Sequence, residues 1–222
     1  IINEGIELAK KYFSNINIDL IYGINSQTLN DLKDELDKFL GLDIPHISIY
    51  SLILEENTIL KVNNYKEINE ELNREMYDYI VSFLEKKGYN HYEISNFSKT
   101  GYDSKHNLTY WNNDKYYGFG LGASGYVNNY RYTNTRSLTK YLKEEYIYEK
   151  DVITKKIDME NYMILGLRKT KGVSISEFKK RYNKEIEDVF DTKNLQREKD
   201  NYFIRKDDLY ISNYILKDFI SL

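Results

Sequence analysis

Apolar and polar positions in the first hundred residues predict helices and strands in turn. Apolar residues recur at helical spacing from Ile2 to Phe13. The nearly continuous apolar run "NINIDLIYG", residues 15–23, predicts a strand buried on both faces of a parallel sheet. A helix follows, in which Thr28 and Asp31 match a capping box. A second strand at 46–54 completes a β-α-β unit, which is right-handed by rule.

A further helix at 67–87 and a strand at 92–97 extend this pattern. Three such steps predict an α/β fold, a partial TIM-like barrel of parallel strands that makes about half of a barrel. Asp19 interrupts the first strand, and a buried carboxylate costs several kcal/mol unless it is paired. Its partner is either the backbone of the turn at 23–27 or a ligand, because acidic groups near the carboxyl ends of parallel strands take ribose hydroxyls.

Between residues 89 and 135 the helical periodicity disappears, which predicts an irregular, β-rich segment. Asn128 and Asn129 predict a hairpin turn. Glycines at 118, 120, 122 and 125 lack the strand before and the helix after that a dinucleotide-binding loop requires, so they predict close backbone packing.

The remaining pattern predicts a small α+β domain of the winged-helix type. A short helix at 136–145 and a linker at 146–156 precede it. We expect three helices, which start at Asp158, start at the cap Ser174 and lie near 184–190. Two strands follow, at 201–205 and 208–212. We therefore divide the chain into residues 1–98 (partial barrel), 99–145 (accessory β-rich insertion) and 146–222 (C-terminal domain).

His106 is the candidate binding residue of the middle segment. Asn107, Tyr110 and Trp111 follow it closely, so one loop would offer an imidazole beside two aromatic faces. That combination suits a flat aromatic ligand such as a porphyrin, with the imidazole on iron. The alternative is a structural histidine hydrogen-bonded through one ring nitrogen. No histidine spacing supports a zinc site.

Composition narrows the chemistry. None of the 222 residues is cysteine, which excludes disulfides, a cysteine nucleophile, thiolate zinc sites and thiolate-held iron–sulfur clusters within this chain. We expect a cytoplasmic protein without a membrane span, because no apolar run is long enough and no signal peptide pattern is present. The net charge is −3, and residues 151–222 carry 15 basic against 13 acidic residues, so we expect no nucleic-acid binding.

Several motifs, in order and spacing, resemble one known family. They are "NINIDLIYG…QT", "HISIYSL", "HYEISNF", "HNLTYW" and "YYGFGLGASGY…RYTNTRSL". Together they are similar to the later part of the HemW family of radical S-adenosylmethionine proteins. These are haem chaperones long described as oxygen-independent coproporphyrinogen III oxidases. The resemblance covers essentially the whole chain, and the His-Asn-x-x-Tyr-Trp pattern separates the chaperones from the true oxidases.

The resemblance implies roles for particular residues. Asp19 is similar to the aspartate that contacts the ribose of S-adenosylmethionine, and Leu52 or Ile53 lies near where the family packs that cofactor. His106, supported by Asn107, Tyr110 and Trp111, matches the haem-associated motif. In the full-length protein the implied cofactors are S-adenosylmethionine, a [4Fe–4S] cluster and haem, and the implied partners are haem-accepting proteins.

Two departures from the family pattern limit these implications. The cluster cysteines are absent, so no residue of this chain is expected to be catalytic and the chain alone is expected to be inactive. Ser124 stands where the family commonly has a histidine, which removes a possible ligand from that loop.

The leading hypothesis is a C-terminal portion of a haem chaperone that binds S-adenosylmethionine and haem and delivers haem to acceptors. The alternatives are an oxygen-independent coproporphyrinogen III oxidase of porphyrin biosynthesis and, third, a nucleic-acid-binding winged-helix module. The strand at 16–22 would lack an upstream neighbour in the barrel, so we also expect self-association through this exposed edge.

Overall fold

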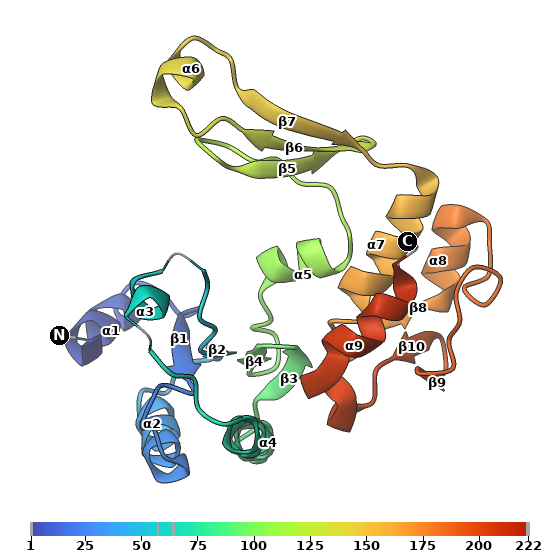
Figure 1. Ribbon diagram of the computed structural model, residues 1–222. Helices are drawn as coiled ribbons and strands as arrows, with labels where there is room; N and C mark the ends of the chain where they lie inside the picture. The colour runs from blue at the N-terminus through green and yellow to red at the C-terminus, as the bar shows by residue number, and fades with distance from the viewer. Residues whose placement is uncertain (1, 57, 64, 221–222) are drawn as a thin grey trace. The chain divides into compact units, whose positions relative to one another are not determined.

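The computed structural model describes residues 2–56, 58–63 and 65–220. The chain forms two compact units, Ile1–Asp103 and Ser104–Leu222 (Figure 1). Among the described residues, no helix is both long and apolar enough to cross a membrane.

The first unit is an α/β arrangement around one four-stranded sheet. Its core is formed by apolar side chains of the sheet and of two long helices. The elements are α1 (Ile2–Lys10), β1 (Asn17–Tyr22), α2 (Leu29–Gly41), β2 (His46–Ser51), α3 (Ile59–Val62), α4 (Glu70–Lys86), β3 (Asn90–Glu93) and β4 (Asn96–Ser98).

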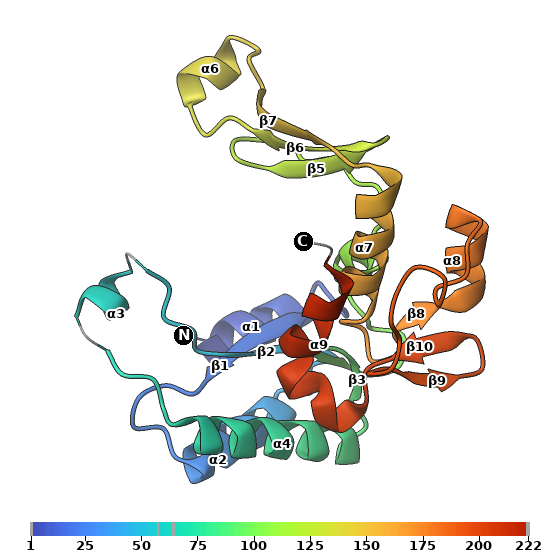
Figure 2. The same ribbon diagram turned by 45° about the vertical axis from the view of Figure 1, so that its right-hand side comes forward.

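Helices α2 and α4 begin where their capping residues lie. The Thr28 side chain accepts a hydrogen bond from the Asp31 backbone, and the Asp31 carboxylate accepts one from the Thr28 backbone, which confirms the predicted capping box. Asn69 caps α4, and Gly88 with a φ of +83° follows its end. The two helices pack side by side on one side of β1 and β2 (Figures 1 and 2).

The prediction of parallel strands is correct for β1 and β2 and wrong for the rest of the sheet. The strand order is β1-β2-β4-β3, and β4 pairs antiparallel with both of its neighbours. The predicted single strand at 92–97 is a hairpin, because Glu93 pairs with Asn96 across a turn formed by Ile94 and Ser95. No glycine or proline marks this two-residue turn, so the sequence pattern concealed it.

The expectation that Asp19 is buried is also wrong. Strand β1 lies at the edge of the sheet, and only one of its faces packs on the core. Ile18 and Leu20 point to the core, whereas Asn17, Asp19 and Ile21 are exposed on the other face. A strand in this position needs only one apolar face, and Asp19 therefore avoids the desolvation that the continuous apolar run implied.

The second unit contains two three-stranded antiparallel sheets and a group of helices. The sheets have the orders β5-β6-β7 and β8-β10-β9. The elements are α5 (Lys105–Trp111), β5 (Ser124–Val127), β6 (Tyr130–Asn134), α6 (Leu138–Leu142), β7 (Ile147–Val152), α7 (Lys155–Gly166), β8 (Val173–Ser174), α8 (Ile175–Tyr182), β9 (Gln196–Glu198), β10 (Asn201–Phe203), η1 (Lys206–Ile211), α9 (Ser212–Leu216) and η2 (Lys217–Phe219).

Two corrections concern the middle of the chain. The segment at 105–111 is a helix, α5, and not a loop, because Ser104 caps it and a short helix needs no long apolar period. The expected linker at 146–156 contains β7, which pairs with β6 although every residue of β7 is exposed. The hairpin through Asn128 is confirmed, and Asn128 has a φ of +49°.

In the C-terminal part, two of the predicted elements differ from the structure. Helices α7 and α8 are present, with α7 starting at Lys155, three residues before the predicted Asp158, after the cap Thr154. The helix expected at 184–190 is not formed, and the strand expected at 208–212 lies largely in the 3-10 helix η1. Buried apolar side chains of these helices and of β10 form the core of the unit.

Candidate functional site

Helix α5 presents the predicted haem motif. Ser104 accepts a hydrogen bond from the Asn107 backbone N–H and so fixes the first turn (3.3 Å). His106 and Tyr110 are four residues apart and therefore lie on one face of the helix. Their side chains meet, because the Tyr110 hydroxyl lies 3.1 Å from His106 Nε2 and the two rings are perpendicular at 4.8 Å.

His106 is exposed, and Nε2 is the ring nitrogen that is engaged. Tyr110 is in turn packed edge-on against Tyr116, with ring centroids 4.6 Å apart. The arrangement holds the imidazole by its Nε2 side and leaves Nδ1 without a hydrogen-bond partner among the described residues. One open imidazole nitrogen can act as a single ligand to a metal. The described residues contain no group of three or more metal-ligating side chains that could hold a metal ion by themselves.

Asn107 and Trp111 lie on a different face of α5 from His106. The Trp111 ring lies against Arg168, whose guanidinium carbon is 5.5 Å from the ring centroid. The indole N–H is buried and has no hydrogen-bond partner among the described residues. The structure therefore brings Tyr110 to His106 and directs Trp111 toward helix α7 and the turn after it.

The C-terminal end of α5 is held by side chains from distant parts of the same unit. Lys169 donates to Asn112 Oδ1 (2.5 Å), and Arg181 donates to the Asn112 carbonyl (3.1 Å). Arg181 also pairs with Asp114. Asn113, with a φ of +54°, donates to Asp158 Oδ1 (2.8 Å). These contacts fix the orientation of a helix that has no buried residue of its own.

Asp158 is the centre of this network, and nothing in the sequence marked it beyond its place near a helix start. In addition to Asn113, the Tyr126 hydroxyl donates to Oδ1 (2.6 Å) and the Tyr182 hydroxyl to Oδ2 (3.0 Å). The four residues come from the turn after α5, strand β5, helix α7 and helix α8. The carboxylate therefore joins four segments that are far apart in the sequence.

The electrostatic surroundings keep this network fixed. Burial, together with the hydrogen bond to Asp158, raises the pKa of both Tyr126 and Tyr182 well above the ordinary tyrosine value, so both remain donors. The Lys115 ammonium lies 3.2 Å from the centroid of the Tyr126 ring, and burial lowers the pKa of this lysine.

Asp19 lies at the end of a chain of hydrogen bonds in the first unit. Asn17 Nδ2 donates to Asp19 Oδ1 (2.7 Å), and Asn17 Oδ1 lies 2.6 Å from His46 Nδ1. His46 Nε2 lies 2.7 Å from the Tyr92 hydroxyl. Asn17 Oδ1 only accepts, so His46 carries its proton on Nδ1 and accepts from Tyr92. The buried His46 thus helps to orient the exposed Asp19, a connection that the sequence did not indicate.

Leu52 and Ile53 follow the end of β2, at the carboxyl edge of the parallel pair. Leu52 N–H donates to the Tyr22 carbonyl (2.8 Å), and Ile53 is 71% exposed. Asp19 lies three residues before the end of β1, or about 10 Å along the strand. Asp19 therefore lies in the middle of its strand, whereas Ile53 lies beyond the carboxyl end of β2.

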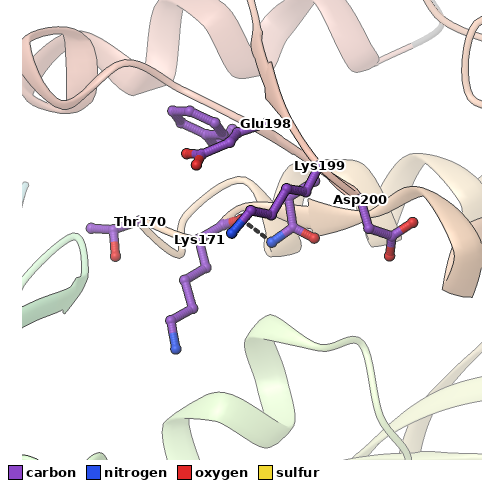
Figure 3. A pocket seen from close by; sticks show the side chains of 7 residues that line it. Thr170, Lys171, Glu198, Lys199 and Asp200 are labelled. Carbon is purple, nitrogen blue, oxygen red and sulfur yellow. Dashed lines mark hydrogen bonds between the residues drawn. The ribbon is translucent and has the colours of Figure 1, made fainter.

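The basic segments near the C-terminus are largely occupied by internal contacts. Arg168, Lys169 and Arg181 all contact the end of α5, as described above. A cavity of about 520 Å³ next to the β9–β10 turn contains Lys171 and Lys199, but Glu198 and Asp200 also line it (Figure 3). Balanced charge around this cavity is not the basic surface that nucleic acid requires.

Comparison with known proteins identifies the family. Residues 153–212 match the HemN C-terminal domain. The "Heme chaperone HemW" of Lactococcus lactis is 44% identical over 191 residues, which cover 82% of this chain and 50% of that protein. The protein of the same name from Bacillus subtilis is 39% identical over 189 residues, covering 80% and 49%. This chain belongs to the HemW-type family.

A solved structure shares the fold. The structure of coproporphyrinogen III oxidase (HemN) from Escherichia coli, described as a Radical SAM enzyme, matches with a TM-score of 0.79 over 98% of this chain and 58% of that chain. At 15% identity this match concerns the fold alone. The HemW-type chain spans about half the length of the curated relatives that it matches. The resemblance seen in the sequence motifs is thus confirmed.

Proposed function

We propose that this chain supplies the haem-binding part of a HemW-type haem chaperone, with His106 as the iron ligand. The observation that carries the proposal is the geometry of His106 on α5, where an exposed imidazole is held at Nε2 by Tyr110 and open at Nδ1. The names of the curated relatives, which are heme chaperones, support haem as the cargo.

The hydrogen bond to Tyr110 engages Nε2 and leaves Nδ1 facing away from it. An imidazole that donates its Nε2 proton to the Tyr110 oxygen keeps a lone pair at Nδ1, and a neutral imidazole nitrogen is a common iron ligand. The Tyr110 ring, supported by Tyr116, adds an aromatic surface beside the imidazole. The Asp158 network holds the helix on which these side chains lie. The chain therefore orients the imidazole toward the iron, and this role requires no proton transfer.

We further propose that Asp19 contributes to a site for S-adenosylmethionine, where its carboxylate accepts hydrogen bonds from the ribose hydroxyls. Asn17 and His46 orient the carboxylate, and Leu52 and Ile53 offer apolar surface beyond the carboxyl end of β2. S-adenosylmethionine bound to a [4Fe–4S] cluster supplies radical chemistry in such proteins. These 222 residues include no cysteine, so they orient the cofactor and do not hold the cluster.

A haem titration followed by the Soret band tests the haem proposal. The wild-type chain is expected to give a saturable band that shifts on binding, and His106→Gln, which retains a polar side chain but not the imidazole, is expected to abolish that shift. Lys105→Ala, one residue away and also exposed, is the matched control and is expected to bind as the wild type does.

Circular dichroism is expected to show an intact fold in this surface variant. An unchanged Soret shift in His106→Gln would then show that His106 is not the iron ligand. The oxidase alternative makes a different prediction, namely that the full-length protein consumes coproporphyrinogen III. We favour the chaperone because the similar curated proteins bear that name.

A further inference from the structure

Residues of the three-stranded sheet β5-β6-β7 line a cavity of about 610 Å³ that plays no part in the haem proposal. Ser124, Thr133 and Glu149 lie in one row across the three strands, and all three line the cavity. Arg136, Ser137 and Lys140 line it from the segment that follows β6.

The wall that bears Arg136 is held in place by buried polar side chains. Asn134 donates to the carbonyls of Gly118 and Gly120 (3.2 and 2.9 Å), and Thr135 Oγ1 accepts from the Ser137 N–H (3.1 Å). The Gly122 N–H donates to the Thr135 carbonyl (3.0 Å). Two strands and a tight loop therefore fix the backbone on both sides of Arg136.

Gly122 leaves space for the aliphatic part of the Arg136 side chain. This glycine has a φ of +68°, and a Cβ atom at this position would lie 3.3 Å from Arg136 Cγ. The aliphatic part of Arg136 thus rests over the glycine, which leaves the guanidinium group at the cavity. A residue with a side chain at position 122 would be strained by its backbone and would press on the arginine stem.

The charges of the cavity are unbalanced toward the positive side. Arg136 and Lys140 line it with one carboxylate, Glu149, and neither cation has an ion-pair partner among the described residues. Ser124 and Thr133 share a hydrogen bond (3.1 Å), and their hydroxyl groups retain further capacity. A guanidinium, an ammonium and hydroxyl groups around one cavity are the donors that recognise an oxyanion.

We infer that this cavity binds a small ligand through a carboxylate or phosphate group held between Arg136 and Lys140. The guanidinium supplies two parallel donors, Lys140 supplies a point charge, and the Ser124 and Thr133 hydroxyls complete the contacts. Tyr148, 74% exposed, lines the cavity as well and offers an aromatic face to the rest of the ligand. This inference is independent of the haem proposal, because no residue of α5 takes part.

Titration of the isotope-labelled chain with inorganic phosphate, and separately with benzoate, tests the inference at constant ionic strength. Saturable shifts of the backbone amide resonances at 122–124 and 133–137 are expected for at least one probe, and the better probe identifies the anion class. Arg136→Gln and Lys140→Gln are each expected to weaken binding about tenfold, since each removes a charged hydrogen-bond partner.

Glu149→Gln is expected to have the opposite effect on affinity. Removal of this carboxylate is expected to tighten binding of the anion several-fold. Lys199→Gln, in the other cavity, is the matched control and is expected to leave binding unchanged (Figure 3). Shifts that never saturate, shifts spread over the whole chain, or equal affinity in wild type and Arg136→Gln would overturn the inference.

Discussion

His46 and His106 are surrounded in opposite ways. His46 is buried in the first unit, and both of its ring nitrogens have partners, Asn17 and Tyr92. His106 lies on the surface of the second unit, and one nitrogen has a partner, Tyr110. A histidine with both nitrogens committed supports the fold, whereas one with an open nitrogen is available to a ligand. The residues that follow His106 in the sequence marked it as the candidate, but they did not reveal which nitrogens of the two histidines have partners.

The two regions also differ in what fixes them. The surroundings of His46 are fixed by strand pairing and an apolar core. Helix α5 has no buried residue and depends on polar contacts with Asp158, Lys169 and Arg181. A helix without buried residues can thus be held in place when polar contacts replace apolar packing. Loss of that network is expected to affect binding and stability together.

The largest expected effect is that of Asp158→Ala. This change removes the carboxylate that accepts from Tyr126, Tyr182 and Asn113, and it is expected to lower the free energy of unfolding by about 3 kcal/mol. The Tyr182 hydroxyl keeps the Asp158 carbonyl as an acceptor (3.1 Å). Urea denaturation measures the loss, and the haem titration is expected to show weaker binding because α5 loses its anchor. Asp188→Ala, an exposed aspartate, serves as the control with little change. Full haem affinity in folded Asp158→Ala would show that the network does not orient α5.

His46→Phe is expected to lower the free energy of unfolding by about 2 kcal/mol at pH 7, because two buried hydrogen bonds are lost. Haem binding is expected to remain unchanged, in contrast to Asp158→Ala. Urea denaturation and the Soret titration measure the two effects. Equal losses of haem affinity in both variants would contradict the distinction between the two regions.

The pH dependence of stability adds a second test at His46. Burial lowers the pKa of His46 below its ordinary value of 6.5, while the nearby Asp103 and Asp19 carboxylates oppose the shift. The unfolded chain therefore takes up this proton at higher pH than the folded chain. The contribution is complete above pH 6.5 and decreases as the pH falls through the folded pKa. Urea denaturation between pH 7.5 and 5 is expected to show this decrease in the wild type and a flatter profile in His46→Phe.

Tyr110→Phe probes the hydrogen bond at His106. Removal of the hydroxyl removes the contact that holds the imidazole at Nε2, and haem affinity is expected to fall about tenfold. The free energy of unfolding is expected to change by less than about 0.5 kcal/mol because the bond is exposed. The Soret titration measures the first effect, with the exposed Tyr117→Phe as its control. An affinity equal to that of the wild type would mean that Tyr110 does not orient the imidazole for the ligand.

The smallest expected effect on stability concerns the edge of the first unit. Strand β1 has one neighbour in the sheet, and we expect the chain to self-associate through its open edge. Ile21→Lys is expected to reduce the association measured by analytical ultracentrifugation, with a change below about 0.5 kcal/mol in unfolding. Ile24→Lys, in the following turn, is the control. A wild type that stays monomeric over the accessible concentration range would contradict this expectation.

Local rules were sufficient for several elements. The caps at Thr28 and Ser174 depend on residues three positions apart, and the hairpin at Asn128 depends on two adjacent residues. The errors occurred where the chain contacts itself at long range. Strand β7 is exposed at every position and forms because β6 offers a partner, and the hairpin of β3 and β4 has no glycine or proline at its turn.

The sequence by itself determined the family, the placement of the haem motif around His106 and the absence of cluster cysteines, because each is a matter of residue identity and spacing. Only the tertiary structure decided which side chains surround those residues. It placed Asp19 on an exposed face, turned Trp111 away from His106 and made Asp158 the centre of a network. The physical reason is that burial and hydrogen bonding are set by segments far apart in the chain, whose meeting no local pattern encodes.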